Sequence, residues 1–127
     1  MIPGVNMSTP ADALEAGSAA EVKVAIRQLN DRLRKTGAGG SVMITAGMAA
    51  LPPDTFAMIL AAIISFDAFT ADNDPHGEHD CASLHVASHD VIWKIDYFDL
   101  ALNMHSPNPA DPKVTRRVLT IMLAEEY

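Results

Sequence analysis

Histidine and carboxylate side chains gather in one polar stretch between Asp67 and Asp80. The stretch contains five acidic residues and two histidines, with no lysine or arginine among them. Carboxylate oxygens and imidazole nitrogens are suitable ligands for zinc, manganese or iron. This composition is compatible with a divalent metal as a cofactor, although it does not by itself establish one. The residues expected to hold it are Asp72, Asp74, His76, Glu78, His79 and Asp80.

Known metal-binding templates fit this stretch poorly. It begins like a calcium loop at Asp72, but Ser83 stands where that loop needs a bidentate glutamate. His76 and His79 are three residues apart and lack the spacing of the helical HExxH motif. Asp, Asn, Pro and Gly also build turns that bond their own backbone. A rigid self-bonded loop is therefore the preferred interpretation, and a metal site and metal-free acid–base chemistry are the alternatives to it.

A second group of polar residues follows along the chain. His85, Lys94 and Asp96 are expected on one side of a hairpin, because side chains alternate along strands. A lysine beside an aspartate can position a metal-bound water, but Ile92 stands where a further acid would be needed. A solvated cross-strand ion pair is the simpler interpretation. For Cys81, a buried position at the entrance of a strand is expected rather than a nucleophilic role.

The elements that must position these residues follow from hydrophobic periodicity and turn residues. Apolar residues at helical spacing predict an amphipathic helix over 20–35 and a nearly all-apolar helix over 52–66. β-Branched and alternating patterns predict strands over 41–46, 83–87 and 91–97, the last two as a hairpin. Asp111 and Pro112 resemble the N-cap and first residue of a last helix. The core stripe expected for that helix is Val114, Val118, Ile121 and Met122.

These elements predict an α+β fold in the order α-β-α-β-β-α. We expect a small antiparallel sheet of three strands, packed with three helices. Residues 1–18, rich in Pro, Gly, Ser and Ala, are predicted to be a flexible lead-in. Residues 19–127 are then expected to form a single domain.

Composition narrows the class of protein. The 127 residues carry 16 acids and nine bases, and the acidic excess lies entirely in residues 65–127. Direct nucleic-acid binding is not expected, because it needs clustered lysine and arginine. The longest apolar run, Phe56 to Ile64, is too short to span a membrane. A lone cysteine and the lack of a basic, signal-like leader lead us to expect a cytoplasmic protein.

Three motifs, DNDPHGEHD, WKIDYFD and DPKVTRRVLTIMLAEEY, carry a resemblance to a known family. From Leu29 to Tyr127 the chain resembles a small bacterial family of unknown function. Its members come mostly from alphaproteobacteria and their plasmids. The resemblance implies a bacterial cytoplasmic protein, often encoded near mobile elements. It implies no reaction and no catalytic residues.

Two functional hypotheses follow. The preferred one is a small acidic binding or regulatory module whose C-terminal half meets a basic protein partner. In a mobile-element setting, it would be a counter-defence protein acting on a host nucleic-acid-binding complex. The alternative is a metal-dependent hydrolase or metal-binding protein that uses the loop at 67–80. The apolar flanks of the helix at 52–66 also point to a homodimer.

Overall fold

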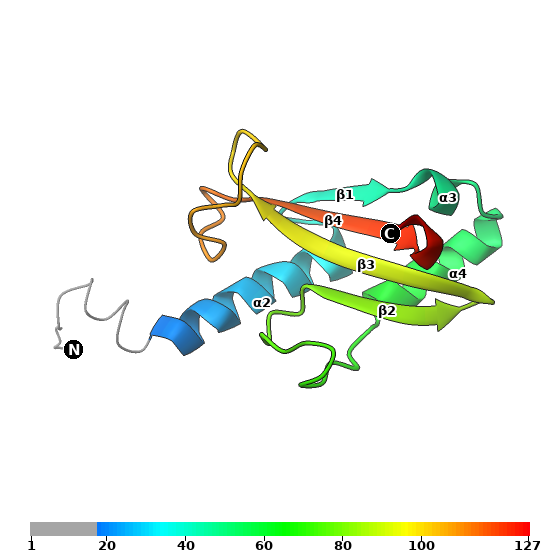
Figure 1. Cartoon of the computed structure of the whole chain (residues 1–127), viewed down its shortest axis with the longest axis horizontal. Helices are drawn as coiled ribbons and strands as arrows, with labels where there is room; N and C mark the ends of the chain where they lie inside the picture. Colours follow the sequence, from blue (N-terminus) through cyan, green and yellow to red (C-terminus); the bar gives the residue numbers. More distant parts are fainter. Residues whose placement is uncertain (1–17) are drawn as a thin grey trace, which may run out of the picture.

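The computed structural model describes residues 18–127, which form three α-helices, four strands and one 3₁₀ helix (Figure 1). The predicted lead-in of residues 1–18 lies outside this range, apart from Ser18, where the first described helix begins. The elements in chain order are α2 (Ser18–Thr36), β1 (Ser41–Ile44), α3 (Ala46–Ala49), α4 (Pro53–Ile64), β2 (Cys81–Val86), β3 (His89–Phe98), β4 (Arg116–Leu123) and η1 (Ala124–Glu126).

The four strands form one mixed sheet in the order β1-β4-β3-β2. The pairs β2–β3 and β3–β4 are antiparallel, whereas β1 pairs with β4 in parallel. The prediction of a three-stranded antiparallel sheet is therefore wrong, although the α+β class is correct. The additional strand is β4, which occupies the segment where a last helix was expected.

Strand β4 replaces the helix predicted to begin at Asp111. Its apolar residues fit helical spacing, but they also alternate, so the local pattern is compatible with both structures. Tertiary pairing selects the strand, because β4 lies between β1 and β3 and both of its edges are hydrogen-bonded. Asp111 caps a turn instead of a helix, since its Oδ1 accepts the Lys113 N–H at 2.9 Å. The inward-facing residues of β4 are Arg117, Leu119, Ile121 and Leu123.

The hairpin of β2 and β3 agrees with the sequence prediction. Ala87 and Ser88 form a two-residue connection with φ angles of 51° and 69°. Positive φ at both central residues is typical of the type I′ turn, which matches the twist of the paired strands. Alternation along β3 places Val91, Trp93 and Ile95 on its inward face, and all three are buried.

Helices α2 and α4 cover one face of the sheet (Figure 1). Leu33 of α2 and Ile59 and Ile63 of α4 pack against the buried residues of β3 and β4 around Trp93. The opposite face presents Ile92, Lys94 and Asp96 of β3, and neither long helix packs on it. We call this the uncovered face. It is the surface on which the polar residues of the hairpin meet solvent.

No helix within residues 18–127 has the length and hydropathy needed to cross a membrane.

Candidate functional site: the 67–80 loop and the uncovered sheet face

The polar loop at 67–80 is fixed to helix α2 through His79. The His79 ring stacks on Phe69 with centroids 3.8 Å apart, and its Nδ1 pairs with Asp31 Oδ1 at 2.9 Å. Asp74 is buried and accepts the His79 backbone N–H at 3.2 Å. His79 also has a φ of 54°, an uncommon value for a residue other than glycine. These contacts hold His79 in that conformation and make it an anchor of the loop.

A second anchor connects the loop to the sheet. The Tyr97 hydroxyl donates to Glu78 Oε1 at 2.7 Å and accepts from Asn30 Nδ2 at 2.7 Å. The same Asn30 amide donates to the Glu78 carbonyl at 3.0 Å, while Asn30 Oδ1 accepts from Arg117 Nε at 2.9 Å. Arg117 lies over the Tyr97 ring and also donates to the Pro109 carbonyl. One buried network therefore joins α2, the loop, β3 and β4.

Arg34 forms the third polar anchor in this region. Its guanidinium donates to the carbonyls of Ile63 and Phe66, each at 2.9 Å, at the end of helix α4. It also pairs with Asp31 at 3.1 Å, and its side chain is 1% exposed. Carbonyls at a helix C-terminus lack intrahelical partners and carry partial negative charge, so a buried cation there is well compensated.

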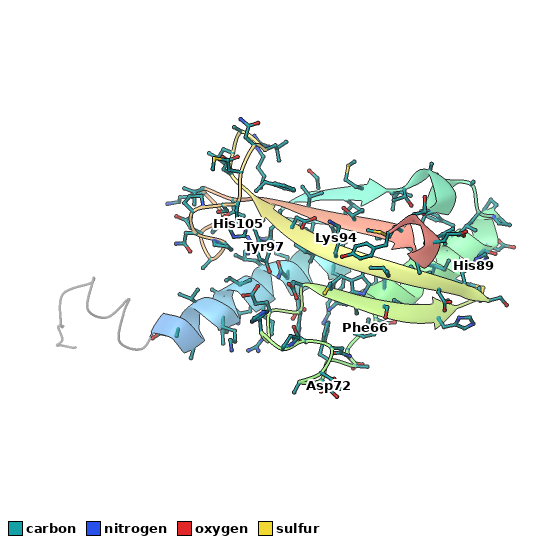
Figure 2. All side chains as sticks on the ribbon, in the orientation of Figure 1. Phe66, Asp72, His89, Lys94, Tyr97 and His105 are labelled. Atoms are coloured by element: carbon teal, nitrogen blue, oxygen red, sulfur yellow. The ribbon has the colours of Figure 1, made fainter. Side chains whose placement is uncertain are left out.

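The six residues predicted to hold a metal are not brought to one point. Asp72 lies exposed at the tip of the loop, away from the sheet (Figure 2). His76 is also exposed, whereas Asp74 and Glu78 face separate anchors. Within residues 18–127, no three His, Cys, Asp or Glu side chains are placed to hold a metal ion. Metal binding by the loop stays a prediction, which a metal-content measurement tests.

The uncovered face is hollowed along β2 and β3. One hollow of about 500 Å³ lies beside the start of β2, and another of about 540 Å³ lies toward the hairpin turn. Ser83 and Ile92 line both, so the two hollows form one continuous strip, which we call the acidic strip. Its lining residues are Asn73, Asp80–Leu84, His85, Asp90–Ile92, Lys94–Asp96, Ala124 and Tyr127.

The structure places His85, Lys94 and Asp96 on this uncovered face, but in two separate pairs. Lys94 Nζ bonds Asp96 Oδ2 at 2.9 Å within β3, whereas His85 Nδ1 bonds Asp90 Oδ1 at 2.8 Å across the hairpin. Lys94 lies opposite Cys81, about 13 Å along β2 from His85. The three residues therefore do not form one site.

Cys81 is exposed, so the expectation that it would be buried is wrong. It opens the edge strand β2 and lies on the uncovered face, opposite Lys94. Desolvation, followed by the charges of Asp80 and Asp74, raises the pKa of the Cys81 thiol. Because the thiolate is the reactive form, this environment disfavours nucleophilic chemistry.

Asp80 is a carboxyl group of the acidic strip whose surroundings disfavour its ionised form. Burial raises the pKa of Asp80 above its ordinary value of 3.8, and the charges of Glu78 and Asp74 raise it further. None of the salt bridges within residues 18–127 includes Asp80. A carboxylate kept in such surroundings at the edge of a hollow is a frequent feature of functional sites.

The main residues that sequence reasoning missed are those of the anchors. Nothing in the pattern of the helix predicted over 20–35 indicates that Arg34 is buried, yet its side chain is 1% exposed. Arg117 was not singled out, yet it is 2% exposed. Asp31 and Arg34 have the three-residue spacing of an ordinary ion pair on a helix surface. Only the packing of the 67–80 loop distinguishes this pair from such a surface pair.

Fold and site together define a small α+β protein in which helices α2 and α4 cover one face of the sheet and polar side chains of β2 and β3 line the other. Residues 44–126 match the family model described as "Protein of unknown function (DUF3768)". The chain therefore belongs to this family, as its resemblance to a family of unknown function predicted. No curated protein and no solved structure matches the chain.

Proposed function

We propose that this protein is a binding module that receives a basic segment of a partner protein along its acidic strip. The strip carries the carboxyl groups of Asp80, Asp90 and Asp96. Lys94 is the one lysine or arginine among its lining residues, and it is already paired with Asp96. This excess of carboxylates around the apolar centre at Ile92 is the observation that carries the proposal.

The chemistry of the strip favours an extended segment that alternates basic and apolar side chains. Ile92 provides apolar contact between the two hollows, while Asp80 and Asp90 lie toward opposite ends. Charge complementarity of this kind accelerates association and makes it dependent on salt. A cation of the partner would also stabilise the ionised form of Asp80, which burial disfavours.

A nucleic-acid-binding protein is one partner with suitable chemistry, since its own binding groove is basic. In the counter-defence form of the hypothesis, the acidic strip occupies that groove in place of nucleic acid. Competition tests this form directly. Added duplex DNA would displace the module from such a partner, whereas a partner bound outside its nucleic-acid groove would hold both.

The first test uses a short synthetic peptide that alternates arginine and valine, labelled for fluorescence anisotropy. A peptide with glutamate in place of arginine is the control ligand. We expect the arginine peptide to bind more tightly, and its affinity to fall as salt increases because the carboxylates are exposed to screening. Equal binding of both peptides would refute the proposal.

Variants then locate the binding surface. Replacing both acids in D80N/D90N is expected to weaken peptide binding by roughly threefold to thirtyfold, the range for two exposed charge pairs. D72N is the matched control, because Asp72 is exposed and does not line the strip, so the variant removes the same charge without changing its lining. A D72N variant that lost as much affinity as D80N/D90N would place the binding surface elsewhere.

A further inference from the structure

We infer that the basic segment received by the acidic strip adds to the sheet as a further strand along the free edge of β2. The inference rests on the proposed function, because it specifies how the backbone of the same partner segment is held. Strand β2 ends the sheet order β1-β4-β3-β2, so only one of its two edges is paired (Figure 1). Strand addition at such an edge is a general mode of peptide recognition, in which backbone hydrogen bonds supply affinity.

The register with β3 determines which backbone groups of β2 are free. The Ile95 N–H donates to the Asp80 carbonyl at 2.7 Å, in the same register that places Ala82 opposite Trp93. Hydrogen-bonded and non-hydrogen-bonded pairs alternate along an antiparallel ladder, so every second residue of β2 directs its backbone groups away from β3. These residues are Cys81, Ser83 and His85, and all three are exposed. No other backbone group within residues 18–127 is hydrogen-bonded to them.

The free edge of β2 lacks the features by which natural proteins protect exposed strands. Protected edges are short, carry proline or lysine, or are interrupted by a bulge. Strand β2 has six residues in unbroken register with β3 and contains neither proline nor lysine. Strand β1, at the opposite edge of the sheet, has only four residues. The edge of β2 is therefore the longer template for pairing with another strand.

Charge complementarity selects basic side chains for the added strand. Asp90 lies opposite His85 near the end of β2, and Asp80 immediately precedes its first residue. Ser83 lies between them and has a short side chain, so a long basic side chain of a neighbouring strand can extend over it toward these carboxylates. A second copy of the chain does not have this complementarity, because pairing two β2 edges would place two acidic strips side by side.

The helix-covered face of β2 selects apolar side chains at the alternate positions of the added strand. Leu84 and Val86 point to that face and are only partly buried at the margin of the core. Side chains of a strand point to opposite faces in turn, so a segment with basic residues on one face presents the residues between them to Leu84 and Val86. Strand addition therefore gives a physical reason for recognition of alternating basic and apolar residues.

Backbone N-methylation of the arginine–valine peptide separates strand addition from the attraction of charges alone. Methylating only the arginines, or only the valines, blocks the N–H groups along one edge of the extended peptide and leaves its charge unchanged. One of the two methylated peptides should bind roughly tenfold to a hundredfold more weakly, because several backbone hydrogen bonds are lost. The other should bind like the unmethylated peptide.

The identity of the weakened peptide gives the direction of the added strand. Loss of affinity with methylated arginines indicates antiparallel addition, because directly opposite residues then share both a face and their hydrogen bonds. Loss with methylated valines indicates parallel addition. Equal affinities of all three peptides, or equal losses in both methylated peptides, would overturn the inference.

The variant S83P tests the same contact from the side of the protein. Proline removes the Ser83 N–H, which faces the free edge, and leaves every charge of the acidic strip in place. S83P should weaken peptide binding by roughly tenfold. S83A is the matched control, because it keeps the N–H, and it should bind like the wild type. Unchanged binding by a folded S83P, checked by the fluorescence of the buried Trp93, would contradict strand addition.

The outcomes distinguish this inference from the proposed function. An arginine peptide that binds no better than its glutamate control refutes the proposed function and strand addition with it. Binding that D80N/D90N weakens, but that neither methylation nor S83P changes, supports the acidic strip and refutes strand addition alone. Sedimentation equilibrium addresses the other occupant, since self-association of the wild type that S83P abolishes would assign the edge to a second copy of the chain and overturn the inference.

Discussion

Replacing Tyr97 by phenylalanine removes a single oxygen atom from the network that anchors the 67–80 loop. The lost hydroxyl donates to the Glu78 carboxylate and accepts from the Asn30 amide, both at 2.7 Å. A hydrogen bond to a charged group contributes about 1.5–3 kcal/mol, and Glu78 is only partly buried. Asn30 keeps its bond to the Glu78 carbonyl, which limits the further loss. We therefore expect Y97F to lower the free energy of unfolding by about 2 kcal/mol.

Urea unfolding followed by the fluorescence of Trp93, the one tryptophan of the chain, measures this change. Trp93 is fully buried in the core, so its emission reports global unfolding. With a denaturant slope of about 2 kcal/mol per molar urea, the midpoint should fall by about 1 M. Y127F is the matched control, because Tyr127 is 82% exposed and forms no side-chain hydrogen bond within the described chain.

Two outcomes would refute the reasoning on Tyr97. A Y97F midpoint equal to that of the wild type would mean that the hydroxyl does not stabilise the loop. A loss equal in both variants would mean that the effect is not specific to the network. Hydrogen exchange adds a local readout, since the amide of His79 should exchange faster in Y97F when the loop is released.

Three further predictions concern single groups. The pKa of Asp80 is raised in the folded state, so folding favours the protonated form of this carboxyl group. The resulting contribution to the free energy of unfolding is complete below pH 3.8 and is lost as pH rises through the folded-state pKa of Asp80. D80N should therefore have a higher melting temperature than wild type at neutral pH, and this advantage should vanish as pH falls toward 3.8. A D80N variant that is less stable at neutral pH would contradict this. Cys81 should react with iodoacetamide more slowly than a free thiol at pH 8, because its pKa is raised; a rate equal to that of free cysteine would argue against the assigned environment. Metal analysis of untagged protein purified without chelator tests the loop as a metal site: bound metal that persists in H76A/H79A would exclude those two ligands.

The sequence by itself determined the elements whose patterns are local and unambiguous. The helix α2, the apolar helix α4 and the hairpin of β2 and β3 were predicted within a few residues. The inward face of β3 followed from alternation, since side chains of a strand point to opposite faces. The acidic character of the second half of the chain and its polar loop were also evident from composition alone.

Tertiary structure decided the features that depend on distant neighbours. The segment around Val118 fits both helical and strand periodicity, and its pairing with β1 and β3 selects the strand. Arg34 and Arg117 have no local signal of burial, because their partners are carbonyls and an amide that folding brings together from other segments. The acidic strip arises in the same way. Asp80 and Asp90 become parts of one surface only when the hairpin closes and both long helices pack on the opposite face of the sheet.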